Sequence, residues 1–99
     1  MMDVEVTSAT LHCALCQRVG VPLTFHHLIP RKNHGKKFFQ KNFSKQDLNE
    51  RGIDVCKLCH KAIHRFFDEM TLGKQLNTLE ALLAQPKVQT HIAWAQRQR

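Results

Sequence analysis

One short stretch of the sequence, Cys-Lys-Leu-Cys-His-Lys-Ala-Ile-His, carries two kinds of metal ligand. Cys56 and Cys59 have the Cys-x2-Cys spacing that lets two thiolates bind one tetrahedral zinc ion. The same spacing recurs at Cys13 and Cys16, where His12 is a less favoured alternative donor. The two pairs together predict a closed structural zinc site with four thiolates.

The same stretch contains histidines at helical spacing. If a helix begins near Cys59, a rotation of about 100° per residue places His60 and His64 on one stripe, beside the stripe that carries Cys59. A third imidazole would come from His26 or His27, which are adjacent in a predicted strand and therefore point to opposite faces. Three neutral imidazoles suit Zn, Ni, Co or Mn and leave coordination positions open for water or phosphate. One helix would thus face two metal sites.

The charge of the chain indicates a polyanionic partner. Fifteen Lys and Arg residues against eight Asp and Glu residues give a net charge of +7, which favours nucleic acid. Residues 31–45 contain no acid, and phenylalanines that we expect to anchor the segment in the core lie between the cations. The cations expected to contact phosphates are Arg31, Lys32, Lys36, Lys37 and Lys41, with Lys45 at the end of the segment.

The sequence has no apolar stretch long enough for a membrane span, and its first residues lack a basic n-region. Residues 1–10 alternate loosely and predict a short strand or a loose end. We expect an intracellular, cytoplasmic protein, in which paired cysteines bind zinc rather than form disulfides. The alternative is a secreted protein with two disulfides, which would show no free thiols.

We expect the elements that position these ligands to form a single domain over residues 1–99. Because the interior of so short a chain is small, a structural metal would add to its stability. We expect the helices to end near Gly52 and Gly73, and Trp94 to be a core anchor. The predicted strands are 23–29 and 53–55, and the predicted helices are 45–50, 60 to about 70, 78–84 and 86–94.

Several of these motifs together resemble a known family. The run His26-His27-Leu28-Ile29-Pro30, followed by Leu58-Cys59-His60 and Ile63-His64, is similar to the HNH endonucleases of the ββα-metal fold, in the subset with a four-cysteine zinc ribbon. The resemblance covers about residues 13–67. It implies an α+β fold with a small ββα-metal (His-Me finger) core stapled by the four-cysteine zinc site over about residues 11–71, and additional C-terminal helices over about 74–99.

The resemblance also implies roles for the histidines. It makes His26 and His60 ligands of a catalytic divalent metal, His27 the general base that activates water, and His64 a further ligand like that of colicin-type nuclease domains. Many members have an acid where His26 stands, so Zn, Ni or Mn is favoured over Mg. The middle Asn of the family is replaced by Arg51, and Asn49 is the other candidate for orienting the general base.

The leading interpretation is a metal-dependent endonuclease that hydrolyses phosphodiester bonds in double-stranded DNA with little sequence preference. It requires His26 and His60 to lie close enough to share one ion. The alternative is a non-catalytic zinc-ribbon module that binds nucleic acid and uses its histidines for packing and hydrogen bonds.

Overall fold

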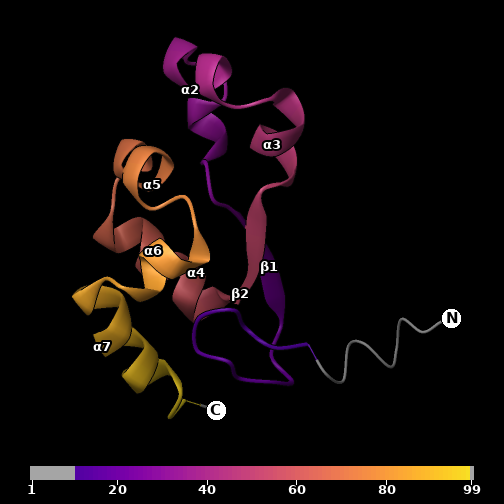
Figure 1. The fold of residues 1–99 in the computed structure, drawn as a ribbon. Coiled ribbons are helices and arrows are strands. Elements are labelled where there is room, and N and C mark those ends of the chain that lie inside the picture. Colours follow the sequence, from indigo (N-terminus) through magenta and orange to yellow (C-terminus); the bar gives the residue numbers. More distant parts are fainter. Residues whose placement is uncertain (1–10, 99) are drawn as a thin grey trace, which may run out of the picture.

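The computed structural model describes residues 11–98, so the prediction for residues 1–10 lies outside the described residues. A two-stranded sheet and a series of helices make a small α+β fold (Figure 1). The elements are β1 (Leu23–His27), a 3-10 turn η1 (Arg31–Asn33), α2 (Lys37–Asn42), α3 (Lys45–Glu50), β2 (Gly52–Cys56), α4 (Lys57–Phe66), α5 (Glu69–Gln75), α6 (Leu79–Leu83) and α7 (Pro86–Ala95).

The sheet consists of β1 and β2 paired antiparallel, with Leu23 opposite Cys56 and His27 opposite Gly52. Side chains alternate between the two faces of a strand, so His26 is buried while His27 is partly exposed, as their adjacency predicts. β2 ends at Cys56, and α4 begins at the next residue, Lys57. The sheet therefore sets where the first turn of α4 lies.

Helix α4 begins at Lys57, three residues before the predicted start, and ends at Phe66. The prediction of one helix continuing to about residue 70 is wrong, because Asp68 starts a new helix, α5, by accepting a hydrogen bond from the Thr71 amide at 2.7 Å. Gly73 lies inside α5 and does not end it. The break turns α5 away from the axis of α4.

The other helix predictions are largely confirmed. The helix over 45–50 is α3, and Ser44 caps it by accepting the Asp47 amide at 3.0 Å. The helix predicted over 78–84 is α6, where Thr78 accepts the Ala81 amide at 3.1 Å, and the helix from residue 86 is α7. Gly52 belongs to β2 and not to the end of α3, which Arg51 caps.

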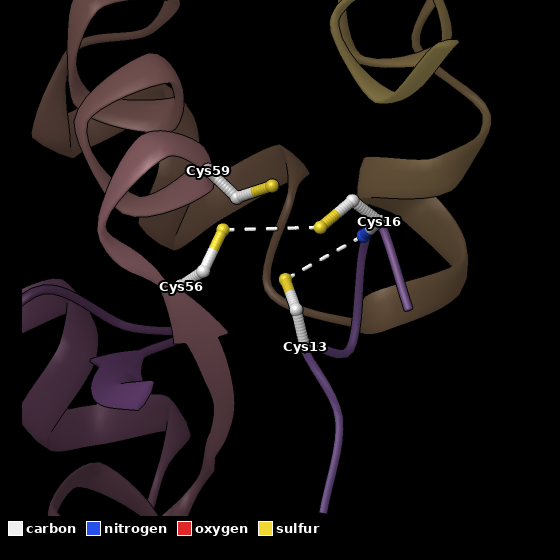
Figure 2. Close-up of side chains that lie close together, drawn as sticks. All are labelled: Cys13, Cys16, Cys56 and Cys59. Carbon is white, nitrogen blue, oxygen red and sulfur yellow. Dashed lines mark hydrogen bonds between the residues drawn. The ribbon is translucent and has the colours of Figure 1, made fainter. Parts of the chain in front are cut away.

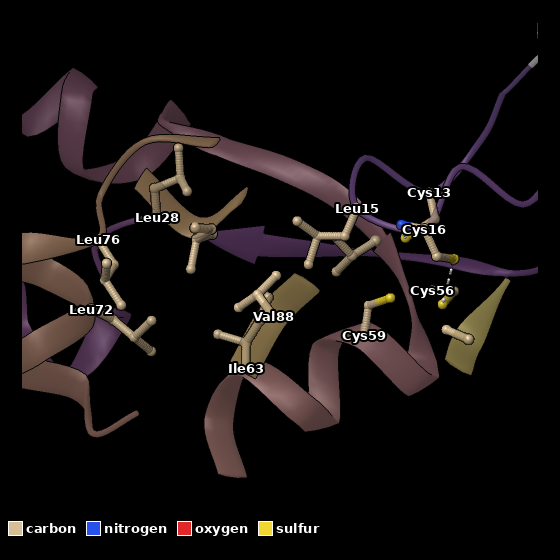
Figure 3. Packing of buried hydrophobic residues seen from close by; sticks show 13 residues of the cluster. Cys13, Leu15, Cys16, Leu28, Cys56, Cys59, Ile63, Leu72, Leu76 and Val88 are labelled. Atoms are coloured by element: carbon tan, nitrogen blue, oxygen red, sulfur yellow. Dashed lines mark hydrogen bonds between the residues drawn. The ribbon is translucent and has the colours of Figure 1, made fainter. Parts of the chain in front are cut away.

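The main hydrophobic core contains the four cysteines together with residues of the sheet and of α4, α5, α6 and α7 (Figure 3). Ile63 of α4 and Val88 of α7 face each other in it, so the C-terminal helices share a core with the cysteine cluster. The prediction that Trp94 anchors this core is wrong, because its side chain is 45% exposed. Within residues 11–98, none of the helices has the length and apolar character needed to span a bilayer.

A second, smaller core anchors the basic segment. The basic segment forms η1 and α2 and ends at the first residue of α3, and Phe39 of α2 is fully buried against Ile29 and Leu48. Phe43 packs against the same cluster, which confirms that phenylalanines hold this segment. Phe38 is the exception, since it is 46% exposed.

The contact between η1 and α5 requires a glycine. Asn33 is fully buried, and its side-chain amide donates to the Glu69 carbonyl at 2.6 Å. A Cβ atom at Gly73 would lie 2.7 Å from that amide nitrogen and 2.8 Å from the ring of Phe39. Both neighbours are enclosed by the core, so they cannot move aside without disturbing it.

We therefore predict that Gly73→Ala lowers the free energy of unfolding by about 1–3 kcal/mol through overpacking. Thermal unfolding followed by circular dichroism measures the effect. Gly35→Ala is the matched control, because a Cβ atom at Gly35 has nothing within 4 Å. Equal melting temperatures for the two variants would contradict the tight packing at Gly73.

Candidate metal centres

Four cysteine side chains converge from two distant parts of the chain (Figure 2). Their Sγ atoms all lie within 4.8 Å of one another, all four residues are buried, and none forms a disulfide. The Cys16 and Cys56 sulfurs are 3.8 Å apart, and a tetrahedral ion with metal–sulfur bonds of about 2.3 Å requires a sulfur–sulfur distance of about 3.8 Å. The cluster fits a structural metal such as zinc, as the cysteine spacing predicts.

The loop that presents Cys13 and Cys16 is held by local hydrogen bonds. The Cys16 amide donates to the Cys13 sulfur at 3.5 Å, and the Gln17 amide donates to the Cys13 carbonyl at 2.9 Å. The Ala14 amide donates to the Asp54 carbonyl of β2 at 2.8 Å, which ties the loop to the sheet. His12 pairs with Val19 in an isolated bridge and is not among the clustered ligands.

The thiols influence one another's ionisation. A hydrogen bond from the Cys59 side chain lowers the pKa of Cys13 to about 4, and the same interaction raises the pKa of Cys59. Burial is the main cause that raises the pKa of Cys16. Thiolates this close repel one another, so a bound cation is needed for all four to ionise, and its binding would release protons.

Arg18 is a contact of this centre that the sequence did not reveal. Its Nε donates to the Cys16 sulfur at 3.5 Å and its Nη2 to the Cys56 sulfur at 3.3 Å. The thiolates raise the pKa of the guanidinium, chiefly through the hydrogen bonds to Cys16 and Cys56. The third nitrogen, Nη1, donates to the Gln98 carbonyl at 3.3 Å, which joins the centre to the C-terminal end of the described chain.

A second group of ligands consists of three histidines. His26 of β1 and His60 and His64 of α4 have ring nitrogens that all lie within 4.8 Å of one another. The ring centroid of His26 lies 5.3 Å from those of both His60 and His64. The structure therefore brings together the three histidines predicted to share one ion.

His26 is the clearest sign of a ligand at this second group. It is only 1% exposed, and neither of its ring nitrogens has a hydrogen-bond partner within the described chain. Burial, and then the neighbouring His64 and His60, lower the pKa of His26 to about 3, so its imidazole is neutral at pH 7. Buried polar atoms are rarely left unpartnered, and a neutral imidazole is the form that binds a metal ion.

Thr24 orients one of these imidazoles. Its hydroxyl donates to the Val55 carbonyl at 3.2 Å and lies 2.8 Å from His60 Nδ1. A hydroxyl that donates to the carbonyl can accept the Nδ1 proton of His60, and this tautomer would leave the Nε2 lone pair free to bind a metal. Nothing in the sequence pattern singled out Thr24.

His27 lies beside the three-histidine group, in a cleft of about 260 Å³. Its ring makes edge contacts with Phe25 at 4.9 Å and with His34 at 5.7 Å between centroids. Burial is the main cause that lowers the pKa of His27, followed by His34 and Arg31. The polar side chains lining the cleft are His26, His27, His60, His64, Arg31, Lys32 and Glu69, of which Glu69 was not predicted.

The remaining predicted site residues lie around this cleft or away from it. Lys36, Lys37 and Lys41 are exposed at α2 and do not line the cleft. The Arg51 guanidinium is directed at Asn77, donating to its carbonyl at 3.1 Å and to its Oδ1 at 3.4 Å. Asn49 is exposed on α3 and lines a different hollow. A role for Arg51 or Asn49 in orienting His27 stays a prediction.

The sequence is similar to that of one bacterial protein. The chain is 31% identical over 86 residues to a protein of Bacillus subtilis (strain 168) described as uncharacterized protein YisB. The alignment covers 87% of this chain and 74% of that protein. No family model matches the sequence, and no solved structure matches it.

The contacts of Arg18 predict its effect on the cysteine centre. Arg18→Met keeps the length of the side chain but removes the N–H groups that face Cys16 and Cys56. We expect zinc bound there to be lost to a colorimetric chelator about 10-fold faster, because partners of metal ligands typically contribute this much to retention. Arg97→Met is the control, because Arg97 is exposed and makes none of these hydrogen bonds to sulfur, and equal release rates would exclude a role for Arg18 at the centre.

Proposed function

The chain belongs to the same family as YisB of Bacillus subtilis, and we propose that it is a metal-dependent endonuclease of the HNH type that hydrolyses phosphodiester bonds in double-stranded DNA. One observation carries the proposal: three histidines converge on a space that one ion can occupy, and a fourth histidine shares their cleft with two cations. This is the set of groups that metal-assisted phosphodiester hydrolysis requires.

We assign β1, β2 and α4 to a ββα-metal core. The order of the three elements supports the assignment, as does the placement of His26 on the first strand and of His60 and His64 on the helix. The cysteine centre lies at the junction of β2 and α4, in the place of a zinc ribbon. The remaining helices complete a small α+β fold around this core.

In this proposal His26, His60 and His64 hold a divalent ion, with Zn, Ni or Mn favoured over Mg. When bound there, the ion would offset negative charge on a phosphate oxygen and on the leaving 3′ oxygen. Thr24 keeps the His60 ring in the orientation that directs Nε2 toward the ligand group. The burial of His26 keeps its imidazole neutral.

His27 is the proposed general base. It follows His26 on β1 but occupies the other face of the strand, so it can serve a different role from that of the metal ligands while lining the same cleft. Burial lowers the pKa of His27, which favours the neutral ring that can take a proton from an attacking water.

The basic residues supply the proposed contacts with the DNA backbone. Arg31 and Lys32 line the cleft itself, where they would hold the scissile phosphate beside His27. The exposed Lys36, Lys37 and Lys41 extend the positive surface along α2. Contacts with phosphates carry no sequence information, which fits a nuclease with little sequence preference.

The proposed activity predicts that zinc-loaded protein nicks supercoiled plasmid when Mn(II), Ni(II) or Mg(II) is added. We expect His27→Ala to slow nicking by about 100-fold or more, because a general base contributes at least that factor. His12→Ala is the matched control, since His12 is exposed and lies outside the cleft. Gel assays of nicking and measurements of zinc content on all three proteins make the test.

Two outcomes would contradict the proposal in different ways. Nicking by His27→Ala at the wild-type rate would remove His27 from the mechanism. No nicking by the wild type, together with one zinc ion per chain and no second, weaker ion under any metal condition, would favour the non-catalytic zinc-ribbon module.

Metal affinity at the three-histidine group can be tested without measuring catalysis. Thr24→Val keeps the branched shape but removes the oxygen that accepts from His60 Nδ1. We expect the affinity of zinc-loaded protein for added Ni(II) or Mn(II) to fall about 10-fold in calorimetric titrations. Thr24→Ser retains the hydroxyl and should restore the affinity. If Thr24→Val binds as tightly as the wild type, Thr24 has no part in orienting His60.

A further inference from the structure

A second concave surface lies between α4 and α7, and the proposed nuclease site does not use it. It is an open hollow of about 750 Å³, larger than the histidine cleft. Helices α4 and α7 pack side by side (Figure 1). The hollow borders the last residues of α4. Its lining includes Arg65 and Phe66 of α4 and Lys87, Thr90, His91 and Trp94 of α7.

Aromatic rings form much of this surface. The Trp94 and His91 ring centroids are 5.6 Å apart, and those of His91 and Phe66 are 6.2 Å apart. Trp94 is 45% exposed, although burying a tryptophan would stabilise so small a core. Trp94, and to a lesser extent Phe66, present ring surface to solvent beside the buried His91 ring, and such a surface is suited to a flat, aromatic ligand.

The charges around the rings are positive. Arg65 and Lys87 are exposed, and the lining contains no acidic side chain. The Arg65 guanidinium carbon lies 5.2 Å from the Phe66 ring centroid, so cation and ring present one combined surface. This combination complements a base attached to a phosphate, whereas a purely apolar protein segment would leave the two cations without partners.

We infer that this hollow binds an unpaired segment of nucleic acid, with a base stacked on Trp94 and neighbouring phosphates against Arg65 and Lys87. The inference rests on the proposed function in so far as both require a nucleic-acid partner. His64 of the histidine cleft and Arg65 of the hollow are consecutive residues of α4, so both surfaces border the C-terminal part of this helix. The hollow would hold the strand beside the cleft.

Trp94 provides a direct measurement because it is the one tryptophan of the chain. Zinc-loaded protein without added divalent metal is titrated with a single-stranded oligonucleotide of about ten nucleotides while Trp94 fluorescence is recorded. We expect saturable quenching as a base stacks on the indole. An abasic oligonucleotide of the same length, which carries the phosphates without the bases, should quench much less.

Variants test the same contact through affinity. Trp94→Ala should weaken binding of a labelled single-stranded oligonucleotide, followed by fluorescence anisotropy, by about fivefold or more. Leu11→Ala is the control, because Leu11 is similarly exposed at 48% and lies outside the hollow. Circular dichroism and zinc content check that both variants fold.

Four results would overturn the inference. Equal quenching by the abasic strand would mean that only charge is recognised, and binding without any change in Trp94 fluorescence would place the strand elsewhere. A fluorescence change that depends on protein concentration alone would identify a second copy of the chain as the occupant. Plasmid nicking without quenching would leave the nuclease proposal standing and refute the inference about the hollow. Quenching without nicking would support the inference and contradict the nuclease proposal.

Discussion

The convergence of four sulfur atoms is the constraint on which the rest of the structure depends. Cys56 ends β2 and Cys59 lies in the first turn of α4, so their fixation to the loop of Cys13 and Cys16 determines how the helix leaves the sheet. His60 follows Cys59 directly. A change in the position or rotation of α4 would therefore carry His60 away from His26, because the two are held by different elements.

Helix α4 serves three surfaces because its side chains project at about 100° intervals. Cys59 and Ile63 are buried in the main core, His60 and His64 line the cleft, and Phe66 lines the hollow beside α7. The C-terminal helix contributes to two of these environments. It supplies Val88 to the core and Trp94 to the hollow, while Arg18 links the thiolates to the chain just beyond it. The C-terminal helices thus share a core with the cysteine cluster.

Two buried polar side chains, His26 and Asn33, differ in how far hydrogen bonds offset the free energy that their burial costs. His26 is enclosed with both ring nitrogens unpartnered in the described chain, and desolvating such atoms costs free energy unless a ligand satisfies them. Asn33 is also fully buried, but its amide nitrogen bonds to α5 and supports the packing of η1. The contrast is that the Asn33 amide nitrogen has a structural partner, whereas both His26 nitrogens lack a hydrogen-bond partner in the described chain and the His26 ring packs against those of His60 and His64.

The sequence by itself determined the features that depend on neighbouring residues. The paired cysteines, the caps at Ser44 and Thr78 and the shared stripe of His60 and His64 all follow from spacings of a few residues, whose geometry the local backbone sets. The cap at Asp68 was a local signal of the same kind, and overlooking it joined two helices into one. Only the tertiary structure decided which distant groups meet, such as Thr24 with His60, Arg18 with Gln98, and the exposure of Trp94. These contacts depend on how whole elements pack, and an apolar or hydroxyl side chain does not by itself specify which neighbour will cover it.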